Sequence, residues 1–451
     1  MTEQPDTIFA LSTPPGRGGI AVFRVSGPAA GAALSALSGG TLPPPRQARL
    51  VELRRPEDGA TIDRGLVLWF PGPASFTGED LAELHLHGGR AVVAAAAATL
   101  AAVPGLRVAE PGEFTRRAFD NQKLDLAEVE GLADLINAET EAQRRVALDQ
   151  LGGALSQAVE GWRRRLIEIA ARLEAWIDFP EEDLPAGLDA AVARDLAALR
   201  DEMTPYLDAE RRGERLRDGL AVAILGAPNV GKSSLLNAVA RRDVAIVSDR
   251  AGTTRDVIEL HLDLRGYPLT LADTAGLRAV AAEGGDEIEV EGVARARGRA
   301  ETADLRLVVF DATLDLAAQT ETADLVTAES LVVFNKVDLA PPPERAALAT
   351  EAVFAVSAKT GAGLEALLAA LAARAEALLG VAGGAAPLTR LRHREALADC
   401  VAALRRAEQA ALPELRAEDL RLALRALGRI TGRVDVEELL DVVFREFCIG
   451  K

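Results

Sequence analysis

The chain has little cysteine and no long apolar run. Its 451 residues include only two cysteines, Cys400 and Cys448, which excludes a disulfide framework or a cysteine-rich metal cluster and fits a reducing compartment. The N-terminal residues MTEQPDTIF contain neither a basic region nor an apolar core, so no secretory signal is visible. The longest apolar run, residues 91–103, is mostly alanine and too short to cross a bilayer. We therefore expect a cytoplasmic protein that does not associate with a membrane.

Lysine is also scarce. Of the 51 basic side chains, five are lysine, and the rest are arginine. The five are Lys123, Lys232, Lys336, Lys359 and Lys451. Arginine is a wide planar fork, whereas lysine is a compact charge on a flexible stem, so the lysines should mark positions where a guanidinium does not fit. Three of them lie in the nucleotide motifs described below. Lys123 and Lys451 indicate a second site, or else they are lysines that occur by chance in a composition biased toward arginine.

Positive charge is in deficit overall. The formal net charge of −17 argues against a protein whose whole surface binds nucleic acid. Local arginine runs, at residues 163–165 and 211–217, are able to contact RNA phosphates on an acidic chain. Such runs are more often solvated helix faces, so both interpretations stay open.

The length allows several domains, and the residue patterns predict four segments. Residues 1–118 mix strand-like runs with turns and predict an α+β domain. Residues 119–217 are helical in pattern, residues 218–378 alternate strands with helices as in a mostly parallel sheet, and residues 379–451 are helical again. The strand-like runs of the first segment are residues 20–25, 65–70 and 84–87. The simplest arrangement inserts the α/β segment between two halves of one helical domain.

A glycine-rich loop follows the apolar run at residues 220–225. The loop reads GAPNVGKS, residues 226–233, and precedes the helical run SSLLNAVA. Glycines let backbone N–H groups wrap the phosphates of a nucleotide, Lys232 should reach the β- and γ-phosphates, and the Ser233 hydroxyl should bind Mg²⁺. The strand before the loop and the helix after it are the context that this motif requires.

Three further motifs follow in the order found in Ras-like GTPases. The sequence DTAG (residues 273–276) comes after an apolar run and would place a carboxylate near Mg²⁺. In NKVD (residues 335–338), Asp338 is able to accept hydrogen bonds from the N1–H and 2-amino groups of guanine, which adenine does not offer. The sequence SAK (residues 357–359) closes the base pocket. The four motifs together predict a P-loop GTPase domain that binds GTP.

The expected nucleotide-binding residues come from these motifs and from the segment SDRAGTT. They are Asn229, Val230, Gly231, Lys232, Ser233, Ser234, Ser248, Asp249, Arg250, Ala251, Gly252, Thr253, Thr254, Asp273, Thr274, Ala275, Gly276, Asn335, Lys336, Asp338, Ser357, Ala358 and Lys359. Thr254 is the expected second Mg²⁺ ligand.

The hydrolysis mechanism departs from that of Ras. Leu277 stands where a glutamine would orient the attacking water. The loop that follows is rich in acids, and one of them could replace the glutamine; alternatively, the stretch is only a polar loop. The acids are Glu283, Asp286, Glu287, Glu289 and Glu291. No arginine finger is evident, so backbone carbonyls near Gly252 could hold a monovalent cation that neutralises charge in the transition state.

Segments along nearly the whole chain resemble the MnmE (TrmE) family of tRNA-modifying GTPases. Besides the four motifs, they are TPPGRGGIAVFRVSG, SFTGEDLAELHLHGG, PGEFTRRAFDNQKLDLAE, AGTTRD and the terminal FCIGK. The resemblance implies a multidomain α/β protein: an N-terminal folate-binding domain that dimerises, a split helical domain and an inserted Ras-like G domain. It implies a potassium-dependent GTPase that works with the FAD-dependent flavoprotein MnmG as a heterotetramer. Together they would add an aminomethyl or carboxymethylaminomethyl group to C5 of the wobble uridine of certain tRNAs, with the one-carbon unit from 5,10-methylene- or 5-formyl-tetrahydrofolate.

The resemblance also implies roles for particular residues. Asn229 would bind K⁺ through its side chain, assisted by the backbone carbonyls of Ser248, Arg250 and Thr253, and Glu289 would be the catalytic acid. The implied folate contacts are Arg24, Glu83, Lys123 and Lys451. Arg24 and Glu83 would otherwise form a structural ion pair. The family's C-terminal cysteine corresponds to Cys448, as a reactive thiol or as helix packing.

Two other functions remain open from the sequence. The G-domain motifs alone would fit a regulatory or ribosome-assembly GTPase, and the N-terminal motifs alone would fit a folate sensor without chemistry of its own. His85 and His87 alternate on a predicted strand and would share a face, which permits metal binding, although no third ligand is nearby.

Overall fold

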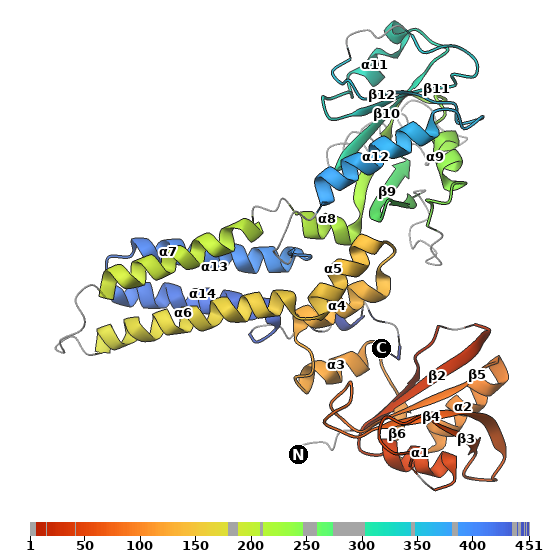
Figure 1. Cartoon of the computed structure of the whole chain (residues 1–451), viewed down its shortest axis with the longest axis vertical. Helices are drawn as coiled ribbons and strands as arrows, with labels where there is room; N and C mark the ends of the chain where they lie inside the picture. The colour runs from red at the N-terminus through yellow and green to blue at the C-terminus, as the bar shows by residue number, and fades with distance from the viewer. Residues whose placement is uncertain are drawn as a thin grey trace, which may run out of the picture. The chain divides into compact units, whose positions relative to one another are not determined.

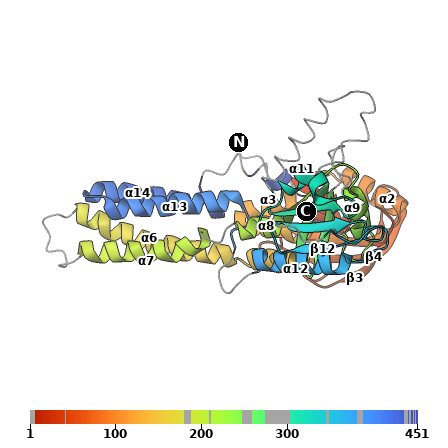
Figure 2. The same cartoon turned by 90° about the horizontal axis from the view of Figure 1, so that it is seen from above.

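The structure is a computed structural model, shown in Figures 1 and 2. It describes residues 6–14, 16–40, 42–178, 188–207, 211–246, 259–273, 303–343, 348–380, 387–434, 440, 443–445, 447 and 449–450. The chain forms two compact units. Unit 1 comprises Met1–Ala133, Gln150–Val192 and Ala403–Lys451, and unit 2 comprises Asp134–Asp149 and Ala193–Ala402.

Unit 1 contains a six-stranded sheet in the order β3-β4-β5-β2-β1-β6. The strands are β1 (Thr7–Leu11), β2 (Gly18–Ser26), β3 (Arg49–Arg54), β4 (Thr61–Phe70), β5 (Leu81–Gly88) and β6 (Leu106–Val108). Neighbouring strands are antiparallel, except that β6 runs parallel to β1. The three strand-like runs predicted in this segment lie within β2, β4 and β5.

Helices α1 (Ala30–Ser38) and α2 (Arg90–Ala102) cover one face of this sheet. Side chains alternate between the two faces of a strand, so Phe23 and Val25 point toward these helices, together with Leu84 and Leu86. The residues between them, Arg24, Glu83 and His85, therefore lie on the opposite face. This face carries Arg24 and Glu83, two of the candidate folate residues.

The helical part of unit 1 includes α3 (Glu113–Asp120), most of α4 (Leu126–Asn137), α6 (Ala154–Asp178) and α14 (Pro413–Thr431). Helix α6 buries an apolar stripe that includes Trp162, Leu166, Ile169 and Leu173. Helices α6 and α14 run side by side (Figures 1 and 2), and an ion pair joins Glu174 of α6 to Arg421 of α14.

Unit 2 contains a second six-stranded sheet in the order β12-β11-β10-β7-β9-β8. Its strands are β7 (Leu220–Leu225), β8 (Glu259–Leu264), β9 (Tyr267–Asp273), β10 (Leu305–Asp311), β11 (Leu331–Asn335) and β12 (Val353–Ala355). All pairs are parallel except β8 with β9. The carboxyl ends of β7, β9, β10 and β11 therefore meet at one edge, where ligands of open α/β sheets bind.

Some of the remaining helices lie wholly in unit 2, and others extend from unit 2 into unit 1. They are α5 (Glu141–Leu151), α7 (Leu188–Leu207), α8 (Arg212–Asp218), α9 (Lys232–Ala240), the 3₁₀ turn Leu316–Gln319, α11 (Thr320–Ala323), α12 (Leu364–Leu379) and α13 (Leu391–Gln409). No helix within the described residues is both long enough and apolar enough to cross a membrane.

Candidate functional sites

The glycine-rich loop connects the end of β7 to the start of α9. Gly226 has a φ of +147°, and a Cβ atom there would lie 2.3 Å from the carbonyl oxygen of Val309. Gly231 has a φ of +96°, and a Cβ atom there would lie 2.3 Å from Nδ2 of Asn335. The obstacle is a backbone atom at Gly226 and a fixed side-chain amide at Gly231. Neither position therefore has room for a Cβ atom, so only glycine fits. The loop conformation is thus built into the sequence.

The loop places backbone donors and a lysine at the N-terminus of α9. Lys232 Nζ donates to the carbonyl oxygens of Gly226 (2.7 Å) and Ala227 (2.9 Å), so the ammonium lies against the loop. Ser233 and Ser234 occupy the first turn of α9, and Asn229 has a φ of +65° within the loop. A helix N-terminus with a neighbouring ammonium attracts phosphate groups.

Hydrogen bonds join the two base motifs to the glycine-rich loop. Asn335 Nδ2 donates to the Val230 carbonyl oxygen (2.9 Å), and its Oδ1 accepts from the Ala358 backbone N–H (3.0 Å). Ser357 Oγ donates to Asp338 Oδ1 (2.7 Å), which fixes the orientation of that carboxylate. Lys359, two residues after Ser357, is exposed. The described parts of the predicted GTP site are therefore in one place.

The rest of the predicted GTP site falls largely outside the described residues. The backbone of Asp273 ends β9 beside Ile224 of β7, at the edge where the loop lies. Outside the described residues are Ser248, Asp249, Arg250, Ala251, Gly252, Thr253, Thr254, Thr274, Ala275, Gly276 and Glu289. Their roles remain predictions.

The open face of the unit 1 sheet carries a polar cluster around Glu83. Arg24 Nε donates to Glu83 Oε1 at 3.1 Å, and His85 Nε2 lies 3.1 Å from Glu83 Oε2. The Arg24 guanidinium also lies 5.8 Å from the ring centroid of Phe76, a cation–π distance. Lys123 Nζ donates to the Pro73 carbonyl oxygen (3.0 Å), so one loop contacts both Lys123 and Arg24. Three of the four predicted folate residues thus lie on the strand pair β2 and β5 or contact the loop that contains Pro73 and Phe76.

The C-terminal tail returns to this sheet. Ile449 forms a β-bridge with Pro111, and Ser12 Oγ donates to the Gly450 carbonyl oxygen at 2.9 Å. Strand β1, which ends at Leu11, pairs with β2 so that Ala10 faces Arg24. Gly450 therefore lies at the end of β1, the strand that pairs with the Arg24-bearing β2. Cys448 and Lys451 lie outside the described residues.

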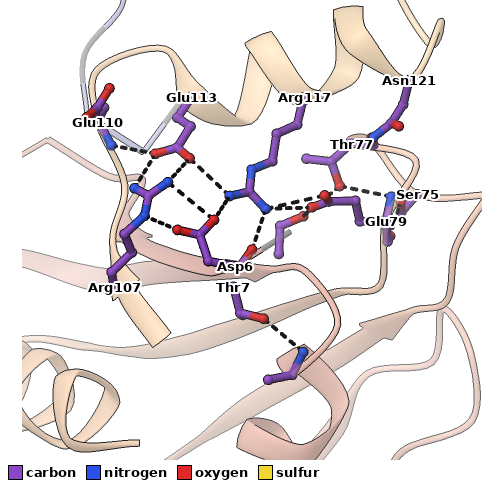
Figure 3. A network of polar contacts seen from close by, with 12 residues as sticks. Asp6, Thr7, Ser75, Thr77, Glu79, Arg107, Glu110, Glu113, Arg117 and Asn121 are labelled. Carbon is purple, nitrogen blue, oxygen red and sulfur yellow. Dashed lines mark hydrogen bonds and ion pairs between the residues drawn. The ribbon is translucent and has the colours of Figure 1, made fainter. Parts of the chain in front are cut away.

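An ion-pair network holds the loop of residues 71–80 against α3 (Figure 3). Arg117 bonds Glu79, Glu113 and Asp6, and Arg107 bonds Asp6 and Glu113. The hydrogen bond from Arg107 is the main cause that lowers the pKa of Asp6, against the effect of burial. Burial would raise the pKa of Glu113, but bonds from Arg107, the Glu110 backbone and Arg117 hold it below the usual value. Both carboxylates are charged at neutral pH, and the network weakens as the pH falls through their lowered pKa values.

Several of these residues were missed by sequence reasoning. Phe76 and Glu79 belong to SFTGED and Arg117 belongs to PGEFTRRAFDNQK, so the motifs contained them without showing which side chains meet. His85 and His87 have carboxylate partners: His85 bonds Glu83, and His87 Nδ1 lies 2.9 Å from Asp63 Oδ1. The part of the chain that the structure describes contains no group of three or more side chains suited to a metal ion.

Comparison with known proteins decides the family. A model described as "MnmE helical domain" matches residues 126–448, and one described as "GTP-binding protein TrmE N-terminus" matches residues 7–123. The chain belongs to the MnmE family of tRNA modification GTPases. Membership confirms the predicted resemblance and GTP hydrolase activity, and it argues against the ribosome-assembly alternative.

Curated MnmE proteins match along their full length. The tRNA modification GTPase MnmE of Parvibaculum lavamentivorans is 58% identical, covering 99% of this chain and 100% of that protein. The MnmE of Rhodospirillum rubrum is 56% identical (99% of each chain), and that of Paramagnetospirillum magneticum is 57% identical (99% and 100%). Among solved structures, the G domain of the T. maritima FeoB iron transporter is 25% identical and covers 34% of this chain and 98% of its own. Its TM-score of 0.25 is too low to support a conclusion about this MnmE-family chain.

Proposed function

We propose that this MnmE-family protein is a potassium-dependent GTPase that installs an aminomethyl or carboxymethylaminomethyl group at C5 of the wobble uridine of certain tRNAs. The one-carbon unit would come from a tetrahydrofolate derivative, and FAD chemistry would come from a flavoprotein partner of the MnmG type. The observation that carries the proposal is that Arg24 pairs with Glu83 on a sheet to whose strand β1 the C-terminal tail is also bonded, in a chain that has the motifs of a GTP site.

The nucleotide site fits GTP with Mg²⁺ and K⁺. Asp338 has one carboxylate oxygen bonded by Ser357 and another that is able to accept the donors of guanine. Ser233, in the first turn of α9, is the proposed first Mg²⁺ ligand, and Thr254 is the proposed second. Asn229, on the loop before α9, would bind K⁺ together with the carbonyls of Ser248, Arg250 and Thr253. Glu289 is the proposed acid that orients water, in place of the glutamine that Leu277 replaces.

The unit 1 cluster fits a reduced folate. A pterin ring presents amide and amino N–H groups along one edge, and a carboxylate such as Glu83 accepts hydrogen bonds from them. Arg24 and His85 each engage one Glu83 oxygen, which fixes the orientation of the carboxylate. Lys123 and Lys451 would bind the anionic glutamate tail of the cofactor, and the bond from Ser12 to Gly450 brings the chain end to this sheet. When bound, the folate supplies the one-carbon unit.

The proposed assembly is a homodimer through the N-terminal domain that joins two copies of the flavoprotein partner. We propose the boundaries 1–118, 119–217, 218–378 and 379–451 for the N-terminal, first helical, G and second helical segments. We propose a cytoplasmic location, which fits a tRNA substrate. Cys448 is proposed to act without forming a covalent intermediate.

Mass spectrometry of wobble nucleosides tests this function. Total tRNA from a strain that lacks the protein should contain unmodified wobble uridine in place of the C5-substituted nucleoside. Return of the wild-type gene should restore it, whereas Glu83→Ala, aimed at folate, and Asp338→Ala, aimed at GTP, should each fail to do so. Growth of the wild type on serine labelled at its β-carbon should label the C5 substituent. Normal modification in the deletion strain would refute the proposal, and an unlabelled substituent would refute the folate source.

A further inference from the structure

An acidic residue outside the GTP motifs contacts the lysine of NKVD. Asp311 is the last residue of β10 and lies opposite Asn335 of β11 in the parallel register. Its Oδ2 lies 2.6 Å from Lys336 Nζ. The side chain of Asp311 is 8% exposed and that of Lys336 is 32% exposed, so the carboxylate of the ion pair is shielded from solvent while the lysine is partly exposed. No motif in the sequence pointed to Asp311.

Asp311 is held by its own neighbours. Its Oδ1 accepts hydrogen bonds from the backbone N–H (2.9 Å) and the Oγ1 (2.7 Å) of Thr313. The buried Gln319 bonds the backbone of Asp311 twice: Oε1 accepts from its N–H (2.9 Å), and Nε2 donates to its carbonyl (3.0 Å). Burial alone would raise the pKa of Asp311, but the bonds from Lys336 and Thr313 hold the pKa below its usual value. The carboxylate is thus a fixed anion at neutral pH.

The ion pair fixes the course of the Lys336 side chain beside the base-recognition residues. Asn335, which precedes Lys336, is tied to the glycine-rich loop, and Asp338, two residues after it, is fixed by Ser357. Lys336 itself has a φ of +66°, an uncommon conformation for this residue type. A lysine whose ammonium is anchored keeps its alkyl stem in one place, and such stems cover apolar surface, including the face of a ring.

We infer that Asp311 is a positioning residue for GTP: it anchors the Lys336 ammonium so that the lysine stem packs on the face of the guanine ring whose edge Asp338 recognises. Asp311 touches neither the base nor the phosphates. Its effect is on how long the nucleotide stays bound, and the bond-breaking step of hydrolysis does not depend on it.

Release of fluorescent mant-GDP, followed by stopped flow, tests the inference. Asp311→Asn keeps the shape of the side chain and removes its charge, and we expect release to be about tenfold faster, which corresponds to about 1.4 kcal/mol. Release of mant-IDP should accelerate by the same factor, because the stem contacts the ring face and the 2-amino group is read by Asp338. The KM for GTP should rise while kcat stays within about twofold, since only binding shared by ground and transition states is lost.

A double-mutant cycle separates positioning from a structural role. Lys336→Met keeps an apolar stem and loses the charge, so Asp311→Asn should have no further effect on release in that background. Asp315→Asn is the matched control, because this exposed acid lies in the following turn and undergoes the same charge change. Thr313→Val, which removes one bond to Asp311, should give a smaller acceleration and serves as a second variant if Asp311→Asn does not fold.

Three results would overturn the inference. Unchanged release in Asp311→Asn would show that the ion pair is dispensable. Slower release would show that Asp311 competes with the nucleotide for the lysine. An equal effect of Asp311→Asn with and without Lys336→Met would assign the loss to general destabilisation of the β10 end.

Discussion

Gly450 is the residue through which the docking of the tail is best tested. Its φ is +94°, and a Cβ atom there would lie 2.3 Å from the carbonyl oxygen of Leu11, 2.9 Å from the Leu11 carbonyl carbon and 3.0 Å from the Cα of Ser12. All three atoms are backbone at the end of β1, which is paired on both sides. They cannot move aside as the end of a flexible side chain would. Gly450→Ala should therefore displace the last residues of the tail.

The magnitude follows from what the docked tail loses. A non-glycine residue in a left-handed conformation costs about 1–2 kcal/mol. Loss of the hydrogen bond from Ser12 to Gly450 adds about 1 kcal/mol. The total of about 2–3 kcal/mol would weaken folate binding by about 30- to 150-fold if the docked tail is needed for it. Phe444 and Phe447 stay packed with Leu126 and Val129, so the melting temperature should change little.

Calorimetry with 5-formyl-tetrahydrofolate provides the assay, and Gly59→Ala provides the control. Gly59 also has a positive φ, +73°, but a Cβ atom there meets nothing within 4 Å. The Gly59→Ala variant should therefore have backbone strain at residue 59 without displacement of the tail, and its folate affinity should equal that of the wild type. Both variants should bind mant-GDP as the wild type does. Wild-type folate affinity in Gly450→Ala would refute the role of the tail, whereas failure of the wild type itself to bind folate would refute the proposed cofactor.

Further predictions concern the lysine of the loop contact, the cation, the catalytic acid and the buried thiol. Lys123→Ala should weaken folate binding in calorimetry by about tenfold, the loss of one charged contact, and leave GTP affinity intact; equal folate affinity would exclude a direct contact. GTP hydrolysis should be faster in K⁺ than in Na⁺, and Asn229→Ala should remove the difference; equal wild-type rates would contradict the cation proposal. Glu289→Ala should bind GTP normally but turn over slowly, and a normal rate would return the role to another acid of the same loop. Cys400 should not react with a thiol reagent in the folded protein, because burial raises the pKa of its thiol to about 12; peptide mapping that finds native-state labelling there would contradict its burial.

The GTP site could be predicted from the sequence because its parts are local. Each motif is a short run of residues that follows a strand, and a glycine loop between a strand and a helix has few other structural roles. Parallel strands bring their carboxyl ends to one edge of the sheet, so the order of motifs along the chain was enough to predict that the described motif residues would meet. The apolar stripe of α6 follows equally from local sequence, since it depends only on the helical period.

The partners of charged side chains required the tertiary structure. Arg24 meets Glu83 because of the register between β2 and β5, and His85 meets the same carboxylate because it lies two residues along the strand. A shift of one residue would have moved each of these side chains to the other face of the sheet, and local patterns do not encode cross-strand register.

The sequence by itself therefore determined the family, the GTP motifs and the presence of two lysines that no nucleotide motif explains. Only the fold decided that Lys336 is anchored by Asp311, 25 positions away, and that the chain end returns to Ser12, 438 positions away. The physical reason is the same in both cases. Residue types and spacing record what a segment forms with its neighbours in the chain, whereas contacts across such separations arise when strands and helices pack together.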